Sequence, residues 1–347
     1  MLVKEHSNFK LVWYSMITKH DDFPHVPDYR VFMTWKENWC FTGVDLENAV
    51  GFVFHISLRP QQGEGIFSVK LDGQAPGERL RIKHVERKKI GLDPSREEDL
   101  STESMSFKVI TPHNKFSLRY EGSQGILDVE FTGRFEPFDF ADGKKAPGSS
   151  TIGELGLHVF PFHHYEQGLQ FTASFTPSTG LGAGKAIKLK GFGNRDHSWG
   201  FRNDFGFQRH HWLCANFKDR YVQGSIMLEQ SYPDVKFGGF IGRETGNVPI
   251  FSAATNDAYW EFPPNVPIGE LNRSVQYSLT DADGNTHLIT AHLDRAVARN
   301  FLNARHPDQN IVYEDCQVFC PFTDDATGEE GSGLLEIGKI VITTTKS

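Results

Sequence analysis

Apolar and polar residues alternate in short runs along most of the chain, and Gly, Pro, Asn and Asp separate these runs. In the run LQFTASF, Leu169, Phe171 and Phe175 fall on one face, and polar residues fall on the other. A two-residue period of this kind indicates a half-buried strand, and FSLRYEG, GILDVEF, AIKLKGF, YVQGSIML and KIVITTT share it. No long segment keeps a helical period, although PSREEDLSTESMS favours a short polar helix. The pattern predicts an all-β protein whose sheet edges are hidden by closure or by paired sheets.

The length of 347 residues exceeds the size at which a single core keeps growing, so two domains are expected. Two segments of the chain, ENWCFTGVDLENAVGFVFHISL and HHWLCANFKDRYVQGSIML, are similar to each other. Their spacing matches Trp39 to Trp212 and Asp45 to Asp219. This internal similarity supports duplication. The least strand-like stretch between the copies is 136–156, rich in Gly, Pro, Ser and charge. The sequence therefore predicts an N-terminal β-domain over 1–155 and a C-terminal β-domain over 156–347.

Charge and composition narrow the classes of partner. The formal net charge of −8 and the pI near 6.0 argue against nucleic acid, which requires clustered Lys and Arg. The densest basic run, 79–89, is interpreted as a solvated insertion, and 83–106 as either a lid or surface decoration. The start of the chain lacks an unbroken apolar segment, and no run approaches the length that spans a bilayer. We expect a soluble cytoplasmic protein without integral membrane association; the sequence does not indicate an oligomeric state.

Aromatic residues are abundant, with 29 Phe, six Trp and nine Tyr, and they are equally compatible with a hydrophobic core or an apolar ligand pocket. The four cysteines contain no C-x-x-C pair and do not form a disulfide framework, so reduced core thiols are expected.

Chemistry-bearing residues gather in two segments, HHYEQ at 163–167 and GFGNRDHSWGFRND at 191–204. Antiparallel strands joined by a tight turn place such segments side by side. Counted from Leu169, His163, Tyr165 and Gln167 share one face, and His164 and Glu166 take the other, unless Gly168 introduces a bulge.

The second segment has a structural and a functional interpretation. Arg195 and Asp196 could fix a turn by ion pairing, and Arg195 and Arg202 could brace a domain junction. Alternatively, Asp196 and His197 could act as a general acid or base whose proton affinity is tuned by burial. Trp199 is interpreted as pocket wall, and Glu37, beside Trp39, could line the N-terminal domain.

Five histidines, His163, His164, His197, His210 and His211, raise the question of a metal. Adjacent histidines on a strand point to opposite faces, and no H-x-H or H-E-x-x-H pattern occurs. We expect neither a catalytic metal nor another cofactor.

HYEQ followed by GFGNRDHSWGFR resembles the hydroxyneurosporene synthase and kievitone hydratase-like family, which is related to the carotenoid hydratases. ENWCFTGVDLENAVGFVFHISLRPQQGEG and GSGLLEIG are similar to that family too, so the resemblance spans most of the chain. It implies two tandem lipocalin-like β-barrels or open barrels packed together. It also implies cofactor-independent acid–base chemistry on a hydrophobic, often isoprenoid, molecule: hydration or dehydration of a C=C bond, or proton-initiated cyclisation or isomerisation.

The resemblance carries over to residues of this chain at the two motifs. The expected catalytic residues are Asp196, His197, His164 and Glu166. The expected substrate-binding residues are Tyr165, Gln167, Arg195, Trp199, Glu37, Trp39 and Trp212. Asp196 would protonate the substrate, with His197 as its helper, in a dry hollow between the barrels. The chain departs from the family pattern after Gly200, which leaves the substrate open.

Three functions follow from these expectations. The first is an enzyme of secondary metabolism, a lyase of the hydratase type or a cyclase or isomerase. The second is a lipocalin-like carrier of a hydrophobic ligand without chemistry. In the third, RDHSWG is a structural clasp and the functional site lies elsewhere.

Overall fold

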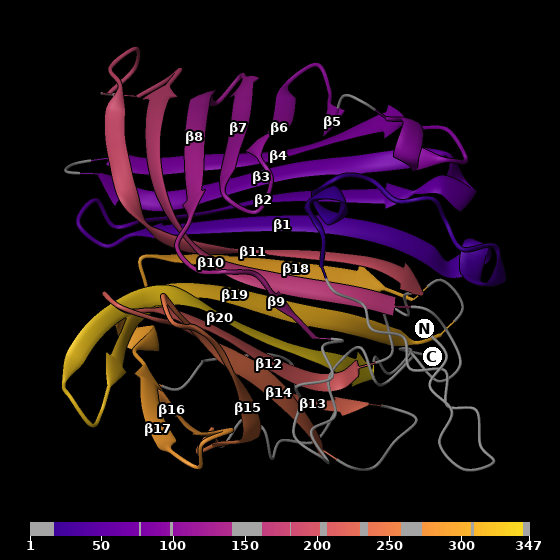
Figure 1. Cartoon of the computed structure of the whole chain (residues 1–347). Helices are drawn as coiled ribbons and strands as arrows, with labels where there is room; N and C mark the ends of the chain where they lie inside the picture. The colour runs from indigo at the N-terminus through magenta and orange to yellow at the C-terminus, as the bar shows by residue number, and fades with distance from the viewer. Residues whose placement is uncertain are drawn as a thin grey trace, which may run out of the picture.

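The computed structural model describes residues 17–75, 78–97, 100–140, 162–180, 182–201, 207–229, 235–257, 273–306 and 309–342. Two antiparallel sheets dominate it, the first drawn in indigo and magenta and the second in orange and yellow (Figure 1). One sheet curves into a half-barrel and the other closes on itself, so the predicted all-β, tandem-barrel architecture is confirmed. Short 3₁₀ helices connect the strands: η1 (Lys19–Asp22), η2 (Tyr29–Thr34), η3 (Pro60–Gln62), η4 (Pro94–Arg96) and η6 (Leu293–Arg295).

The first sheet has the strand order β4-β3-β2-β1-β11-β10-β8-β7-β6-β5, with β9 paired to β10. Its strands are β1 (Trp35–Asp45), β2 (Val50–Arg59), β3 (Glu64–Ala75), β4 (Glu78–Lys89), β5 (Leu100–Ser101), β6 (Met105–Thr111), β7 (Lys115–Gly122), β8 (Gly125–Gly133), β9 (Phe138–Asp139), β10 (Phe162–Pro177) and β11 (Ile187–Phe201). Its concave face holds an aromatic core, in which Phe52 meets Phe171 edge to face at 4.9 Å. Many of the chain's phenylalanines thus fill this core.

The second sheet has the order β17-β16-β15-β14-β13-β12-β20-β19-β18, and pairing of β17 with β19 closes it into a barrel. Its strands are β12 (Phe207–Asn216), β13 (Tyr221–Glu229), β14 (Val235–Arg243), β15 (Gly246–Thr255), β16 (Val275–Asp281), β17 (Thr286–Ala291), β18 (Ala298–Arg305), β19 (Ile311–Asp324) and β20 (Glu329–Ile342). Because β17 pairs with the end of β19 that β18 does not cover, β17 is not left as an open edge strand. The barrel core is largely aliphatic, with Cys316 and Cys320 buried as free thiols.

The division between the sheets differs from the predicted domain boundary. Strands β10 and β11 pair with β1 and β8, so the first sheet extends to Phe201 and the second begins at Phe207. Both motifs therefore belong to the first sheet, whereas the predicted boundary at 155/156 assigns them to the C-terminal domain. The reason is that β11 returns to pair with β1, a long-range closure that local composition does not encode. Most of the stretch 136–156 lies outside the described residues.

The internal sequence similarity has a structural counterpart. Trp39 lies in β1 and Trp212 in β12, and each strand forms a hairpin with the next strand in its sheet. The last strand of each sheet, β11 or β20, pairs antiparallel with the other side of that hairpin's first strand. The aspartates differ, because Asp45 is buried and Asp219 is exposed.

The basic run 79–89 is not an insertion. It forms β4, the edge strand of the first sheet, in which Leu80 and Ile82 are buried and most of the Lys and Arg residues are exposed. Lys and Arg on an edge strand oppose edge-to-edge association, which explains the charge density that resembles a loop. The short polar helix predicted nearby is a single 3₁₀ turn, η4.

The two sheets pack through a third apolar cluster that includes Val44, Phe138, Phe140, Tyr221 and Phe240. In Figure 1, β10 and β11 lie next to β18, β19 and β20, where the half-barrel meets the closed barrel. A Cβ atom at Gly168 would lie 2.6 Å from the Cβ of Tyr221, so only glycine permits this approach. Within the described residues, no helix has the length and apolar content needed to cross a bilayer.

Candidate functional site

The two motifs form one antiparallel ladder. Tyr165 pairs with His197, Glu166 with Asp196 and Gln167 with Arg195, without a register shift at Gly168. The prediction that the segments lie side by side is confirmed, and so is the predicted phase of β10. RDHSWG does not form the turn suggested for Arg195 and Asp196, because the whole motif continues β11.

Glycines in β11 allow that strand to lie close to β1. A Cβ at Gly193 would fall 1.9 Å from the carbonyl oxygen of Thr42, and a Cβ at Gly191 would fall 2.1 Å from that of Val44. No side chain fits at these distances. The glycine content of the motif therefore serves strand packing.

The predicted site residues divide between two faces of the first sheet, because side chains alternate along β10 and β11. Seven share the concave face, where all are buried: Tyr165, Gln167, Arg195, His197, Trp199, Glu37 and Trp39. Three lie on the opposite face: His164, Glu166 and Asp196. Glu166 and His164 contact Trp212 of the second sheet there. Asp196 and His197 thus do not enter one hollow together, and the expected acid–helper pair is not formed.

On the concave face, Arg195 is held by residues of η1 and β10. Its Nη1 donates to Asp22 Oδ1 at 2.5 Å and its Nε donates to Gln167 Oε1 at 2.8 Å. The hydroxyl of Tyr165 also donates to Asp22 Oδ1, at 2.5 Å. Burial acts to raise the pKa of Asp22, but Arg195 and Tyr165 outweigh it and lower that pKa. This arrangement braces η1 against the half-barrel.

A second group on the concave face centres on Glu37. Its Oε1 lies 3.0 Å from His197 Nε2 and 2.6 Å from His25 Nδ1. Trp39 stacks on His197 at 4.2 Å and Trp199 stacks on His25 at 3.9 Å. Glu37 and His197 are completely buried.

Sequence reasoning missed Asp21, Asp22 and His25, which complete this concave-face cluster. They belong to η1 and the segment after it, which lack a strand period. The density of polar residues in KHDDFPH is the one signal in the sequence that could have identified them.

On the opposite face, Glu166 is the centre of a cluster at the junction of the sheets. Trp212 Nε1 donates to Glu166 Oε1 at 2.6 Å, and the Tyr221 hydroxyl donates to Oε2 at 3.2 Å. His164 Nε2 lies 3.5 Å from Oε1. We call Glu166, Asp196, His164, Trp212 and Tyr221 the junction cluster.

Aromatic rings surround the junction cluster. Phe140 meets His164 edge to face at 4.8 Å and lies 6.0 Å from the ring of Trp212. Phe138 stacks on Phe240 at 4.4 Å beside it. The environment of Glu166 is therefore poor in water and lined by π faces.

Burial decides the protonation of Glu166. It raises the pKa to about 8, although the bonds from Trp212 and Tyr221 act in the opposite direction; Glu336 adds a smaller upward contribution. Glu166 is completely buried and is a neutral acid at pH 7. Asp196 is its direct cross-strand neighbour on the same face and is partly exposed. A buried carboxylic acid beside a more accessible carboxyl is one arrangement that can support acid–base chemistry.

A further buried polar group lies on the same side of the second sheet. His210 Nε2 contacts Glu336 Oε1 at 3.0 Å, and Gln317 Nε2 donates to Glu336 Oε2 at 2.9 Å. Burial, and then the charge of Glu336, raise the pKa of Asp315 well above its usual range. His211, the neighbour of His210, faces Tyr277 in the barrel interior, as strand alternation predicts.

Two His and carboxylate groups in the described chain bring three potential ligand atoms within 4.8 Å of one another: His25, Glu37 and His197, and His210, Asp315 and Glu336. The first offers two nitrogens and an oxygen, and the second one nitrogen and two oxygens. Spacing within one segment could not reveal either group, because each draws on three separate elements.

The chain belongs to the family whose model is described as Domain of unknown function (DUF7064), which matches residues 18–340. No curated protein matches the sequence. Among solved structures, the fold is similar to that of a Nitrosomonas europaea protein assigned as AttH, with a TM-score of 0.58, 15% identity and coverage of 92% of this chain and 93% of the other. It is also similar to kievitone hydratase from Nectria haematococca, with a TM-score of 0.55, 12% identity and coverage of 93% and 99%. At these identities the similarity is one of fold alone. It agrees with the resemblance to kievitone hydratase-like proteins that the two motifs indicate.

Proposed function

We propose that this protein is an acid–base enzyme that acts on a hydrophobic small molecule at the junction cluster, as a hydratase-type lyase or as an isomerase or cyclase. The observation that carries the proposal is Glu166: a carboxyl with no exposed surface, a pKa of about 8 and aromatic neighbours. A structural carboxylate at this depth normally has a cationic partner. The hydrogen bonds to Glu166 come from neutral donors, Trp212 and Tyr221, and the basic side chain of His164 contacts it at 3.5 Å.

The roles of the residues differ from those expected from the sequence. Glu166, in place of Asp196, supplies the proton, because it is the carboxyl whose environment keeps it neutral. Asp196 receives a proton, because it is partly exposed and directly opposite Glu166. His164, next to Glu166 at 3.5 Å, positions that carboxyl, whereas His197 has no part on this face.

The reaction balances with these groups alone. Glu166 transfers its proton to one carbon of a C=C bond, and the π electrons form the new C–H bond and leave a carbocation at the other carbon. The rings of Trp212 and Phe140 lie where they stabilise such a cation. Water then adds to the cation and loses its proton to Asp196, which gives a hydration. If Asp196 instead removes a proton from a neighbouring carbon, the product is an isomer. Solvent returns the proton to Glu166.

The name of one fold neighbour, kievitone hydratase, agrees with the hydratase branch of the proposal. The expectations of an isoprenoid substrate and a cytoplasmic location remain predictions. A carrier needs an apolar wall and at most one polar anchor, so the several titratable groups of the junction cluster favour an enzyme over a carrier.

The test is incubation of the full chain with a panel of isoprenoid alcohols and polyenes, followed by mass spectrometry for gain or loss of water and chromatography for isomers. Glu166→Gln should abolish turnover and leave ligand uptake intact. Asp315→Asn is the matched control, because it replaces another buried carboxyl whose pKa is raised by burial, and it should retain turnover. If ligand binds and no product forms with the wild-type protein, the protein is a carrier. Equal turnover by Glu166→Gln and the wild type would refute the assigned centre.

A further inference from the structure

We propose that His25, Glu37 and His197 hold a divalent metal ion of the zinc class that ties η1 and the following segment to the half-barrel. His25 Nδ1 and His197 Nε2 converge on one carboxylate oxygen, at 2.6 and 3.0 Å from Glu37 Oε1. All three ligand atoms lie within 4.8 Å of one another. Two imidazoles and one carboxylate form a donor set that suits zinc, whereas magnesium and calcium prefer oxygen alone.

The outer nitrogens of both histidines support this assignment. His25 Nε2 lies 3.0 Å from Asp21 Oδ1, and His197 Nδ1 lies 2.6 Å from the Asp21 carbonyl oxygen. Histidines that bind metals almost always donate their outer N–H to a carboxylate or a backbone carbonyl, which leaves the inner lone pair for the ion. Here a single residue, Asp21, supplies both acceptors.

The surroundings fix the ligands in place. Trp39 stacks on His197, and Trp199 stacks on His25, so neither ring can rotate freely. Glu37 and His197 are completely buried, while the side chains of His25 and Asp21 are 20% exposed and provide an entry path. The sequence argued against a metal because no ligand pair occurs within one motif; these ligands come from three segments.

The test is zinc binding by the full chain after chelator treatment and dialysis. Competition with a chromogenic chelator and elemental analysis should give one zinc per chain in the wild type. His25→Gln and His197→Gln should each weaken zinc affinity on the order of 100-fold. His163→Gln is the matched control, because His163 stacks on Trp199 at 4.9 Å and belongs to neither ligand group. This variant should bind zinc as the wild type does. Cobalt substitution should add visible absorption bands to the wild type and to the control.

Three results would overturn the metal proposal. The first is a wild-type chain that binds no zinc at concentrations up to 100-fold above that of the protein. The second is zinc that is lost in His210→Gln and retained in His197→Gln, which would move the site to the other ligand group. A variant that fails to fold does not obscure the result, because zinc should also raise the melting temperature of the wild type by about 5 °C, and an unchanged melting temperature contradicts the proposal.

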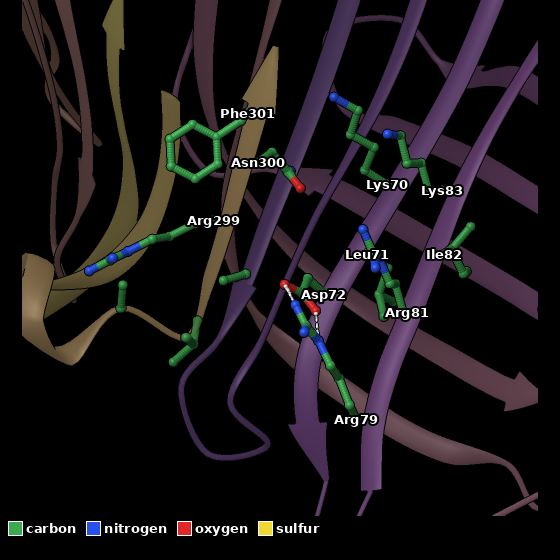
Figure 2. A pocket seen from close by; sticks show the side chains of 13 residues that line it. Lys70, Leu71, Asp72, Arg79, Arg81, Ile82, Lys83, Arg299, Asn300 and Phe301 are labelled. Carbon is green, nitrogen blue, oxygen red and sulfur yellow. Dashed lines mark hydrogen bonds and ion pairs between the residues drawn. The ribbon is translucent and has the colours of Figure 1, made fainter. Parts of the chain in front are cut away.

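A separate observation carries a second proposal, on the groove between β3, β4 and β18. A cavity of about 510 Å³ lies there, lined by the cations Lys70, Arg79, Arg81, Lys83 and Arg299. Figure 2 shows Lys70 and Lys83 side by side, Arg79 joined to Asp72, and Arg299 turned away toward its own sheet. Arg79 and Asp72 form a bidentate ion pair at 3.0 and 2.9 Å and neutralise each other.

Three cations in this groove lack an ion-pair partner among the described residues, although the charge of Asp315 acts on Lys70, and one buried donor lacks an acceptor. Lys70, Arg81 and Lys83 form no ion pair with any residue that the structure describes. Lys70 and Lys83 are direct cross-strand neighbours, an arrangement of like charges that destabilises a sheet. Asn300 is 8% exposed, and its Nδ2 donates to no partner within the described chain. An oxyanion would resolve the repulsion and accept from Asn300.

We infer that the groove binds a soluble phosphorylated small molecule. The cavity is larger than a single phosphate, which leaves room for an organic part against the exposed ring of Phe301. A membrane headgroup is a poorer candidate, because the net charge of −8 repels an anionic bilayer and the groove lies between two sheets.

Isothermal titration with inorganic pyrophosphate tests this inference. The wild type should bind it, the double variant Lys70→Gln/Lys83→Gln should lose at least 10-fold in affinity, and Lys89→Gln, an exposed cation of the same strand outside the groove, should not. Vesicles of phosphatidylcholine with one-tenth phosphatidic acid form the second arm and should not retain the protein. Vesicle binding without pyrophosphate binding, an equal loss in Lys89→Gln, or no binding by the wild type would each overturn the proposal.

Discussion

Asp196 and His197 are neighbours in the chain, yet they face opposite sides of β11: His197 faces Glu37 on the concave side, and Asp196 faces the junction with the second sheet. This relationship follows from the two-residue period of a strand. It separates the two chemistries that the motif combines. The concave side braces the N-terminal segment, and the junction side carries the proposed acid.

The brace predicts a stability difference between two aspartates. Arg195 is completely buried, and its ionic partner is Asp22, not Asp196. Asp22→Asn should therefore reduce the free energy of unfolding by about 3–5 kcal/mol, since it leaves a buried guanidinium uncompensated. Asp196→Asn should cost less than Asp22→Asn, because Asp196 is partly exposed and is not the ionic partner of Arg195. Denaturant unfolding of both variants measures the difference, and equal losses would show that the brace is misassigned.

The buried acid predicts that stability depends on pH. The pKa of Glu166 is about 8 in the folded chain against 4.5 in the reference state, so the folded chain binds more protons between these values. Its contribution is fully present below about pH 4.5 and is lost as the pH rises to about 8. Glu166→Gln cannot ionise and should exceed the wild type by a few kcal/mol at pH 9, with a smaller difference at pH 5. Melting curves at both pH values measure this. A wild type that is the more stable of the two at pH 9 would contradict the assignment.

The bond from Trp212 predicts a shift in the pH profile of activity. Its N–H stabilises the ionised form of Glu166, so Trp212→Phe should raise the pKa of Glu166 further, by about 1 unit. Turnover requires the protonated acid and falls as the pH rises through this pKa. The alkaline limb of the pH–rate profile should therefore move upward in the variant. A limb that stays in place would exclude Glu166 as the group that titrates.

The close approach of β11 to β1 predicts strong intolerance to one methyl group. In Gly193→Ala the new Cβ would lie 1.9 Å from the Thr42 carbonyl oxygen, so the strands must separate. This variant should lose more than about 3 kcal/mol or fail to fold. Gly184→Ala is the control: it has a φ of +75° and no atom within 4 Å of the new Cβ, so it should cost about 1 kcal/mol. Soluble yield and thermal melting compare the two.

The alternation of apolar and polar residues predicted those features of the fold that depend on neighbouring residues in the sequence. The strands, the faces of β10 and the pairing of the two motifs all follow from alternation and short connections. The pairing of β11 with β1 does not, because it joins segments about 150 residues apart, and the predicted boundary failed there.

For the candidate site, the sequence predicts which face of the sheet each side chain occupies, but not which residues it contacts there. Alternation along β10 separated Glu166 from Tyr165 and Gln167, and applied to β11 it separates Asp196 from His197. The partners of these residues lie beyond sequence reasoning, since Asp22 and His25 come from a segment without a strand period and Tyr221 from the second sheet. The pKa of Glu166 depends on burial between two sheets, which spacing does not reveal.

The protonation of Glu166 at neutral pH is the claim on which the proposed function depends. Infrared difference spectroscopy between the wild type and Glu166→Gln, recorded across a pH titration, isolates the carboxyl stretch of this one residue. The account predicts a protonated carboxylic acid band at pH 7 that converts to a carboxylate band with a midpoint near 8. A carboxylate band that is already complete at pH 6 would contradict it.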